Sequence, residues 1–298
     1  MLGVLIAGAA YIVSNTLVNL ETRRIASGFA FLAREAGFEI GESAFLAYNA
    51  ADTYLRALAV GLANTLFAAA LGIVLATLLG FAVGLLRLAK NALAAALSSV
   101  YVEFMRNVPL LVQLFFWYVM LTETLPHPRE ALQPLPGVFL SNRGLFFPTP
   151  GSFPELQGFN FVGGFALSPE FAALLIGLVT YTAAFIAEIV RAGIISVPRG
   201  QVDAAYALGL DRAQTLRHVV IPLALRVIVP PLTSQYLNLI KNSSLAVAIG
   251  YPDLVSIANT TINQTGQAIE GIAIIMAVYL TISLAISAFM NWYNARLK

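Results

Sequence analysis

A run of thirty residues, 57–86, contains no charged side chain. A helix needs about 20 mostly apolar residues to cross the hydrocarbon core of a bilayer, so this run is long enough to span. Only 11% of the 298 residues are charged, whereas an average soluble domain has about 25%. A soluble protein of this length would lack the charges that solvate its surface. The chain is therefore predicted to be an integral membrane protein.

Five further apolar runs are predicted to cross the membrane: residues 1–20, 107–122 (extending back through 101), 171–187, 219–240 and 271–295. A backbone in lipid has no water to bond, so each span must form its hydrogen bonds internally as a helix. The predicted fold class is all-α, a polytopic transmembrane helical bundle. A secretory signal peptide is the alternative for residues 1–20. They contain no Lys or Arg and no convincing cleavage site follows, which favours a transmembrane helix.

The distribution of arginine predicts the orientation. Four arginines lie in the short segment between the fourth and fifth spans: Arg191, Arg199, Arg212 and Arg217. The positive-inside rule places that segment in the cytoplasm. Both termini are then cytoplasmic, in agreement with Arg296 and Lys298, and residues 21–53 and 123–170 are external. Three arginines in the first external segment oppose this placement of the first helix: Arg23, Arg24 and Arg34.

The predicted organisation has an N-terminal helix and external loop over residues 1–53 and a transmembrane domain over 54–298. The external insert, about 123–170, has seven prolines between 126 and 154 and is predicted to resist regular structure. Its phenylalanines indicate contact with the membrane surface or with a partner. In the second span, small residues repeat every four positions: Ala68, Gly72, Ala76, Gly80 and Gly84. Such a ridge allows close helix packing in lipid. Packing within the chain is favoured over a subunit interface.

The segment from 188 to 222 departs from membrane composition. Pro198 is expected to break the preceding helix, and Gly209 is placed to cap a short helix that begins near Asp203. Asp211 is then predicted to be an N-cap, with Gln214 completing a capping box. The segment is predicted to form two short amphipathic helices joined by a tight turn on the cytoplasmic surface. An interfacial helix lying on lipid is the alternative, but the segment 203–205 offers neither basic residues nor bulky anchors.

This segment resembles the EAA loop of ABC-importer permeases, which has the pattern E-A-A-x3-G-x9-I-x-L-P. The corresponding residues here are Asp203, Ala204, Ala205, Gly209, Val219, Ile221 and Pro222. Three positions depart conservatively: Asp203 for Glu, Val219 for Ile and Ile221 for Leu. The spacing is intact over twenty residues, which makes the resemblance specific.

Other segments are similar to the polar amino-acid subfamily of these permeases. They are the run 101–116, the pair Gly200 and Gln201, and the segment 241–245. Leu223 departs from the subfamily, which usually has Gln after the proline. The long insert, the extra first helix and the segment 234–244 are similar to the larger permeases of general L-amino-acid and glutamate/glutamine/aspartate/asparagine importers. The resemblance covers about residues 50–298.

The resemblance implies a type I ABC-importer permease core of five helices plus one extra N-terminal helix, located in a bacterial inner membrane. It implies a permease subunit that translocates amino acids delivered by a periplasmic binding protein. The implied partners are a second related permease, most often in a heterodimer, and two ABC ATPase subunits that bind ATP and Mg. The coupling loop, about residues 191–222, would dock on the ATPase. Its implied contact residues are Gly200, Gln201, Asp203, Ala204, Ala205, Tyr206, Gly209, Leu210, Val219, Ile221 and Pro222.

The chain itself is predicted to hold no cofactor, no metal and no catalytic residue. It lacks the Gly-x4-Gly-Lys-Ser/Thr phosphate loop, and none of its three lysines follows glycine. It has no cysteine, and its two histidines, His127 and His218, lie far apart. A net charge of +2 makes nucleic-acid binding unexpected. An ion-gradient-driven secondary transporter and a membrane hydrolase are the alternatives. The sequence shows neither the inverted repeat and mid-span acids typical of a secondary transporter nor the Gly-x-Ser-x-Gly elbow typical of a hydrolase.

Polar residues near the spans are the candidates for a substrate pathway. A charged group within a span costs about 2.5–3.5 kcal/mol on insertion scales, so it usually faces a cavity or a partner. A zwitterionic amino acid needs a cation near its carboxylate and an acceptor near its ammonium. The candidates are Gln113, Arg226, Asn238, Lys241, Asn242, Ser243 and Ser244. Pairing within the protein or snorkelling toward headgroups is the alternative for each.

Overall fold

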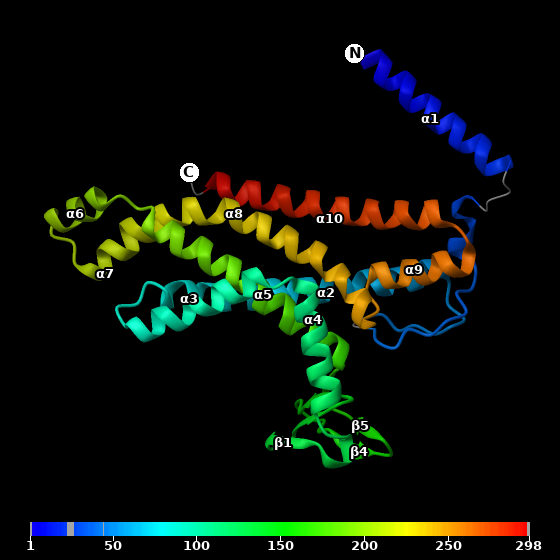
Figure 1. Cartoon of the computed structure of the whole chain (residues 1–298), viewed down its shortest axis with the longest axis horizontal. Coiled ribbons are helices and arrows are strands. Elements are labelled where there is room, and N and C mark those ends of the chain that lie inside the picture. Colours follow the sequence, from blue (N-terminus) through cyan, green and yellow to red (C-terminus); the bar gives the residue numbers. More distant parts are fainter. Residues whose placement is uncertain (1, 23–26, 44, 297–298) are drawn as a thin grey trace.

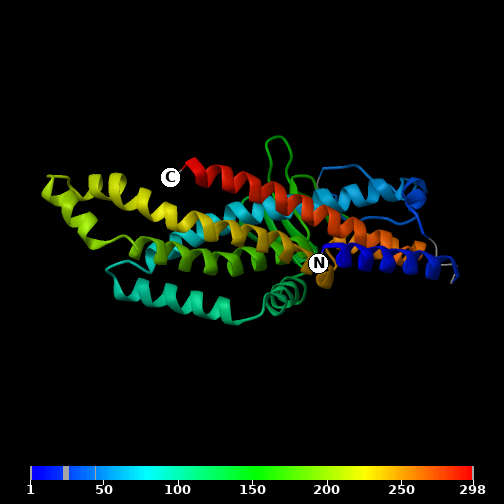
Figure 2. The same ribbon diagram turned by 90° about the horizontal axis from the view of Figure 1, so that it is seen from above.

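The computed structural model describes residues 2–22, 27–43 and 45–296, so Arg23, Arg24 and Lys298 lie outside the described residues. Ten α-helices account for most of that part of the chain. They are α1 (Leu2–Thr22), α2 (Tyr54–Leu86), α3 (Ala92–Asn107), α4 (Leu110–Val119), α5 (Pro169–Ile195), α6 (Arg199–Ala207), α7 (Arg212–Thr215), α8 (Ile221–Asn242), α9 (Leu254–Thr265) and α10 (Ala268–Arg296). Helices α2, α5, α8 and α10 run along the long axis of the molecule (Figure 1, Figure 2). The all-α bundle is confirmed.

Within the described residues, four helical segments are long and apolar enough to cross a membrane: Tyr54–Leu86, Pro169–Ile195, Arg212–Ile249 and Ala268–Arg296. They correspond to four of the six predicted spans. A fifth is formed if the bent pair α3 and α4 counts as one span. The remaining prediction, residues 1–20, coincides with α1, which is helical but is not among these candidates.

The predicted third span is not one straight helix. Helices α3 and α4 meet at 104°. The cause is Pro109, because the residue before a proline is pushed out of the helical region, and Val108 is extended with φ −91° and ψ 126°. The side-chain amide of Gln113 donates to the carbonyl oxygens of Met105 and Val108, both at 3.0 Å. These carbonyl oxygens lie at the end of α3, where a helix leaves its last carbonyls without helical partners. The Gln113 amide therefore stabilises the bend.

The small-residue ridge of α2 packs inside the chain, as predicted. Ala68 and Ala76 are fully buried. A Cβ atom added at Gly80 would lie 2.6 Å from the side chain of Ile186, on α5. A Cβ atom at Gly84 would lie 2.8 Å from the carbonyl oxygen of Ala187, on the same helix. Glycine at these two positions lets α2 and α5 approach within contact distance of their backbones.

The prediction that the insert resists regular structure is wrong. Strands β1 (Leu132–Leu135), β2 (Val138–Ser141), β3 (Gly144–Phe147) and β6 (Phe165–Leu167) form an antiparallel sheet in the order β1-β2-β3-β6. Strands β4 (Glu155–Gln157) and β5 (Asn160–Val162) form a hairpin. The prolines are compatible with this sheet because six of the seven lie in connections and Pro134 lies in the edge strand β1. Phe161 stacks on Phe139 with ring centroids 4.4 Å apart.

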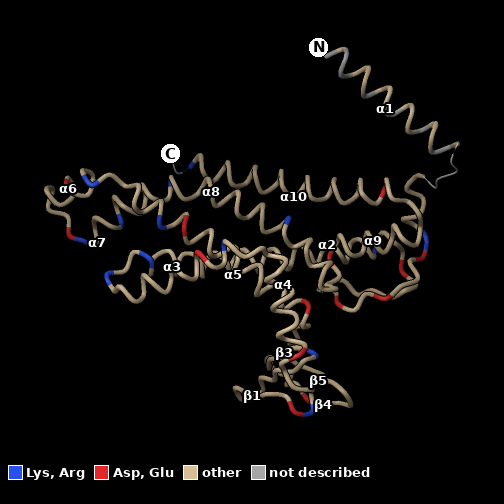
Figure 3. The backbone as a smooth tube through the Cα atoms, viewed as in Figure 1, with Lys and Arg blue, Asp and Glu red and all other residues tan. Residues whose placement is uncertain are grey.

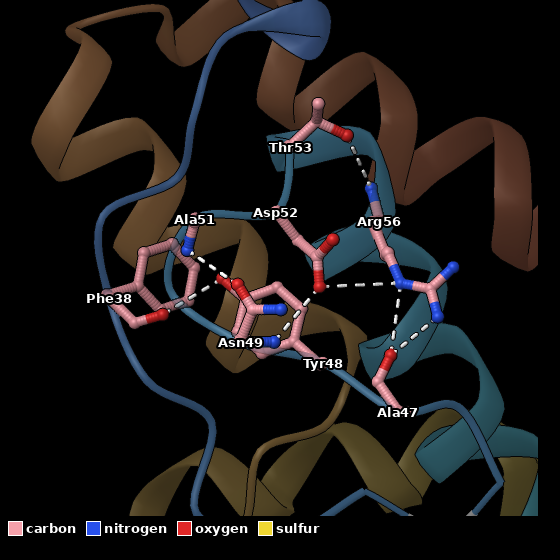
Figure 4. A network of polar contacts seen from close by, with 8 residues as sticks. All are labelled: Phe38, Ala47, Tyr48, Asn49, Ala51, Asp52, Thr53 and Arg56. Atoms are coloured by element: carbon pink, nitrogen blue, oxygen red, sulfur yellow. Dashed lines mark hydrogen bonds and ion pairs between the residues drawn. The ribbon is translucent and has the colours of Figure 1, made fainter.

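The described part of the loop between α1 and α2 is held against the helices. Phe31 is buried in a cluster with Tyr54 at the start of α2 and Ile257 of α9. Figure 4 shows the polar contacts that shape residues 47–56: the Asp52 carboxylate accepts from the Asn49 N–H at 3.0 Å and lies 3.5 Å from the Arg56 guanidinium. The loop therefore forms an ordered cap on the end of the bundle opposite α6 and α7 (Figure 1).

Candidate coupling and translocation site

The segment after α5 forms the two short helices and tight turn expected from its sequence. Pro198 is the N-cap of α6, and α6 ends in a turn centred on Gly209, whose φ is +81°. The N–H of Gly209 donates to the Tyr206 carbonyl oxygen at 2.9 Å, and the N–H of Leu210 donates to the Ala205 carbonyl oxygen at 3.1 Å. These two bonds make a Schellman motif. The left-handed backbone favours glycine here through its positive φ alone, because nothing else lies within 4 Å of a Cβ that could clash.

The second short helix, α7, begins with the predicted capping box. The Asp211 carboxylate accepts from the Gln214 N–H at 2.8 Å, and the Gln214 side chain accepts from the Asp211 N–H at 2.9 Å. A π-helical turn, Leu216–Val220, then connects α7 to α8. The turn between α6 and α7 is thus fixed on both sides by a local hydrogen-bonded motif. The α6–α7 pair projects at one end of the molecule (Figure 1).

The outer surface of α6 combines exposed polar side chains, including Gln201 and Asp203, with exposed apolar ones. Ala205 is only 3% exposed and faces inward, while Leu208 at the tip is 84% exposed. Tyr206 is about half exposed, and Asp203 and Ala204 are exposed beside it. Each of the other predicted coupling residues is either exposed or half-buried. Gly200, Gln201 and Gly209 are exposed along α6 and its turn, Leu210 and Val219 are half-buried, and Ile221 and Pro222 are exposed at the start of α8.

An ion-pair cluster anchors the base of this loop. Glu188 of α5 accepts from the Arg191 guanidinium at 2.6 Å. The same carboxylate accepts from Arg87, the C-cap of α2. Because Arg87 precedes Glu188 by 101 residues, no local pattern in the sequence predicts this contact. Basic residues gather at the end of the molecule that carries α6 and α7 (Figure 3).

The substrate-pathway candidates fall into three structural groups. Arg226, Asn238 and Lys241 are exposed on α8, where Pro230 and Ser234 continue the same exposed row at a spacing of four. Asn242 is partly exposed after them. Ser243 and Ser244 donate to the carbonyl oxygens of Ile240 and Lys241, at 2.8 and 2.7 Å, and so cap the end of α8. Gln113 is buried at the α3–α4 bend and is not brought together with the α8 row.

The sequence analysis missed a buried polar cluster near the opposite end of the bundle. The fully buried Asn64 amide of α2 donates to the carbonyl oxygens of Glu42 and Pro252, both at 2.9 Å. Thr65 accepts from the N–H of Leu254 at 3.0 Å. The external cap, α2 and the start of α9 are thereby joined. No charge or motif marks Asn64 within its apolar run, so only the fold exposes its role.

Asp253 opens the short helix α9. Its carboxylate accepts from the Ser256 N–H at 2.8 Å as the N-cap of α9. Burial raises the pKa of Asp253 to about 7, against the lowering effect of the backbone N–H bonds. A cavity of about 460 Å³ lies nearby, lined by Glu39, Glu42 and Glu170 together with Pro252 and other residues. Burial also raises the pKa of Glu42, although Ser168 donates to its carboxylate at 2.5 Å.

These features define a membrane-spanning transport subunit with a structured loop built for a partner. The chain matches the family model described as "Binding-protein-dependent transport system inner membrane component" over residues 72–298 and belongs to that family. The match confirms the permease predicted from the spacing of the EAA loop.

Three relatives cover nearly the whole chain. It is 48% identical to the putative amino-acid ABC transporter permease protein YhdX of Escherichia coli (strain K12), over 95% of this chain and 88% of that protein. It is 42% identical to the general L-amino acid transport system permease protein AapQ of Rhizobium johnstonii, over 99% and 89%. It is 36% identical to the glutamate/glutamine/aspartate/asparagine transport system permease protein BztB of Rhodobacter capsulatus, over 98% and 91%.

Solved structures share the fold. A chain of the "crystal structure of an amino acid ABC transporter with histidines" superposes with a TM-score of 0.63 and 28% identity, covering 82% of this chain and 95% of that one. An inward-facing MetNI methionine ABC transporter gives a TM-score of 0.56 at 17% identity, over 81% and 96%, and supports the fold alone. The type I importer fold expected from the sequence is consistent with both.

Proposed function

We propose that this chain is the permease subunit of an ATP-driven importer that moves amino acids into the cytoplasm after a periplasmic binding protein delivers them. The cargo is general L-amino acids or the glutamate, glutamine, aspartate and asparagine group, as in the names of AapQ and BztB. The observation that carries the proposal is the α6–α7 loop, whose turn is locked by the Leu210–Ala205 hydrogen bond while Leu208 projects from it.

The loop transmits the closure of an ATPase subunit to the spans. A partner that receives α6 meets a shallow surface of alanines around Ala204, flanked by Tyr206 and Leu208. The hydrogen-bonded motifs at Gly209 and Asp211 fix most backbone dihedral angles of the loop. A displacement of α6 therefore moves α7 and the start of α8 together with it. Such closure is a rigid-body change between two access states. ATP and Mg belong to the ATPase, and this chain carries no cofactor and no catalytic residue.

The exposed row on α8 faces the translocation pathway. Arg226 and Lys241 supply cations for a carboxylate, and Asn238 lies between them along the helix. Polar side chains in a span are expensive to expose to lipid. A second, related permease therefore covers this face and completes the pathway. The working unit is a heterodimer of permeases with two ATPase subunits, in the inner membrane, with both termini cytoplasmic.

Reconstitution in vesicles tests this function. With the binding protein and ATPase present, amino-acid uptake depends on ATP, and Asp203→Lys abolishes uptake although the chain still inserts. Co-purification of the ATPase with the Asp203→Lys chain at the wild-type level, with uptake intact, would contradict the role of the loop. Gradient-driven uptake by the chain alone, without ATP, would instead favour a secondary transporter.

A further inference from the structure

One face of the four-stranded sheet consists only of large apolar side chains. Residues paired directly across antiparallel strands project from the same face. The register pairs Leu132 with Leu140, Leu140 with Leu145 and Leu145 with Leu167, so one leucine row crosses all four strands. The pairs Leu135–Val138 and Phe147–Phe165 flank this row. We call this surface the leucine face: Leu132, Leu135, Val138, Leu140, Leu145, Phe147, Phe165 and Leu167.

The leucine face points away from the core of its own sheet. The core lies on the opposite face, where Phe139 and Phe146 contact Phe161 of the hairpin. None of the eight leucine-face residues is buried. Leu132, Leu135 and Phe165 are 52%, 64% and 45% exposed. The other five are half-buried, and a partly exposed apolar face of this kind indicates a binding surface.

The composition of the leucine face favours contact with lipid hydrocarbon over contact with a transient protein partner. The face has no charged side chain and no side-chain hydrogen-bonding group, whereas a non-obligate protein interface is only about 56–58% apolar. The charges of the insert lie elsewhere, at Arg129, Glu130, Arg143 and Glu155. Strand addition at β1 is opposed by Pro134, which lacks an N–H to donate.

The position of the sheet brings the leucine face to the bilayer. Only Ser168 separates β6 from α5, which is a candidate span, and one residue reaches roughly 3.5 Å. Leu167, at the end of the leucine row, packs against the bundle cluster that contains Phe171 and Leu114. One end of the leucine face therefore adjoins the bundle. Both views place the sheets beside the bundle, along its length, rather than beyond its tip (Figure 1, Figure 2).

Helix α4 extends the same apolar surface. Its residues Phe116 and Val119 are exposed, as is Met120 directly after it, and the sheet unit lies at the outer end of α4 (Figure 1). The 104° bend directs α4 away from the bundle. Apart from Gln113 and the polar ends of Trp117 and Tyr118, the side chains of α4 are apolar, so α4 has no charged face for a water interface.

We propose that the leucine face lies on the lipid surface of the leaflet opposite the α6–α7 loop. Its side chains enter the boundary between headgroups and acyl chains, and the hairpin that carries Glu155 and Gln157 points toward water. The insert then anchors the outer ends of α4 and α5 laterally in the bilayer.

Single-cysteine labelling tests this placement, because the chain contains no cysteine of its own. Leu135→Cys and Phe165→Cys place a nitroxide on the leucine face, and Gln157→Cys places one on the exposed hairpin as the matched control. All three positions are exposed, so the label replaces no buried side chain. The full chain, with the subunits that co-purify, is reconstituted in phosphatidylethanolamine–phosphatidylglycerol vesicles. Collisions with oxygen, which partitions into lipid, are compared with those of a water-soluble nickel chelate.

We expect the logarithm of the oxygen-to-nickel collision ratio to have opposite signs on the leucine face and on the hairpin. The ratio favours oxygen at positions 135 and 165 and favours nickel at position 157. Nickel access at positions 135 and 165 would overturn the proposal by placing the face in water. Protection of both positions from both reagents would overturn it too, because it would mean that a protein partner covers the face.

Discussion

The N–H of Leu210 donates to the carbonyl oxygen of Ala205 at 3.1 Å, across the turn that ends α6. This bond, with the left-handed Gly209 inside it, sets the direction in which Leu208 projects. This hydrogen bond between two backbone groups of the loop is the structural basis of the coupling role proposed for it.

Gly209→Val is expected to uncouple ATP hydrolysis from uptake. A β-branched residue at φ +81° costs roughly 1–3 kcal/mol, which the loop can relieve only by changing the turn. The matched control is Gly151→Val in the insert, where φ is +85° and nothing lies within 4 Å of the added Cβ. Parallel assays of ATPase activity and uptake check the pair. Equal loss of uptake in both variants would mean that general instability, rather than the loop, is responsible.

Glu188→Gln is expected to lower uptake while α6 still binds its partner. The change leaves the Arg87 and Arg191 guanidiniums facing each other without a carboxylate. Hydrogen bonds to charged groups contribute roughly 1.5–3 kcal/mol each, so the link between α2 and α5 weakens. Co-purification of the ATPase measures binding, and uptake measures transmission. Wild-type uptake by Glu188→Gln would show that this cluster does not transmit movement.

Gly80→Ala is expected to destabilise the bundle. The added methyl group would lie 2.6 Å from Ile186, and overpacking of this kind typically costs about 1–3 kcal/mol. Gly8→Ala in α1 is the control, because nothing lies within 4 Å of its added Cβ. Thermal unfolding in detergent compares the two. A melting temperature unchanged in Gly80→Ala would contradict the close α2–α5 contact.

Asp253→Asn is expected to change the pH dependence of stability. The folded chain holds the Asp253 proton up to about pH 7, whereas the ordinary pKa is 3.8, so its contribution to stability falls as pH rises between these values. Asparagine keeps the N-cap acceptor and removes this slope. Unfolding measured from pH 4 to 8 should show a variant more stable than wild type at the upper end. Parallel curves for the two chains would contradict the buried, protonated state. Asp211→Asn, at the exposed N-cap of α7, serves as the control.

The parts of the fold that local chemistry determines were predictable from the sequence. Pro198, Gly209 and Asp211 each act within a few residues: α5 ends before Pro198, and Gly209 and Asp211 form the caps expected of them. The ridge of α2 was also predictable, since a helical spacing of four defines one face. The partner of that ridge, α5, was not.

The parts that depend on distant partners could not be predicted. The leucine row joins residues from four strands, and no single strand shows it. The contact between Arg87 and Glu188 joins two helices far apart in the chain. The bend at Pro109 was within reach, because a proline inside an apolar run is a local signal. It was missed because the uncharged run on either side favoured one continuous span.

The most direct test of the coupling role is a crosslink from the tip of the loop. Leu208→Cys is the sole cysteine in the chain, and its exposed position accepts a short bifunctional reagent without disturbing the turn. In the assembled transporter, the account predicts a crosslink to the ATPase subunit whose yield changes when ATP is added, and none from Gln157→Cys in the insert. Absence of any crosslink from position 208 to the ATPase, in a transporter that remains active, would contradict it.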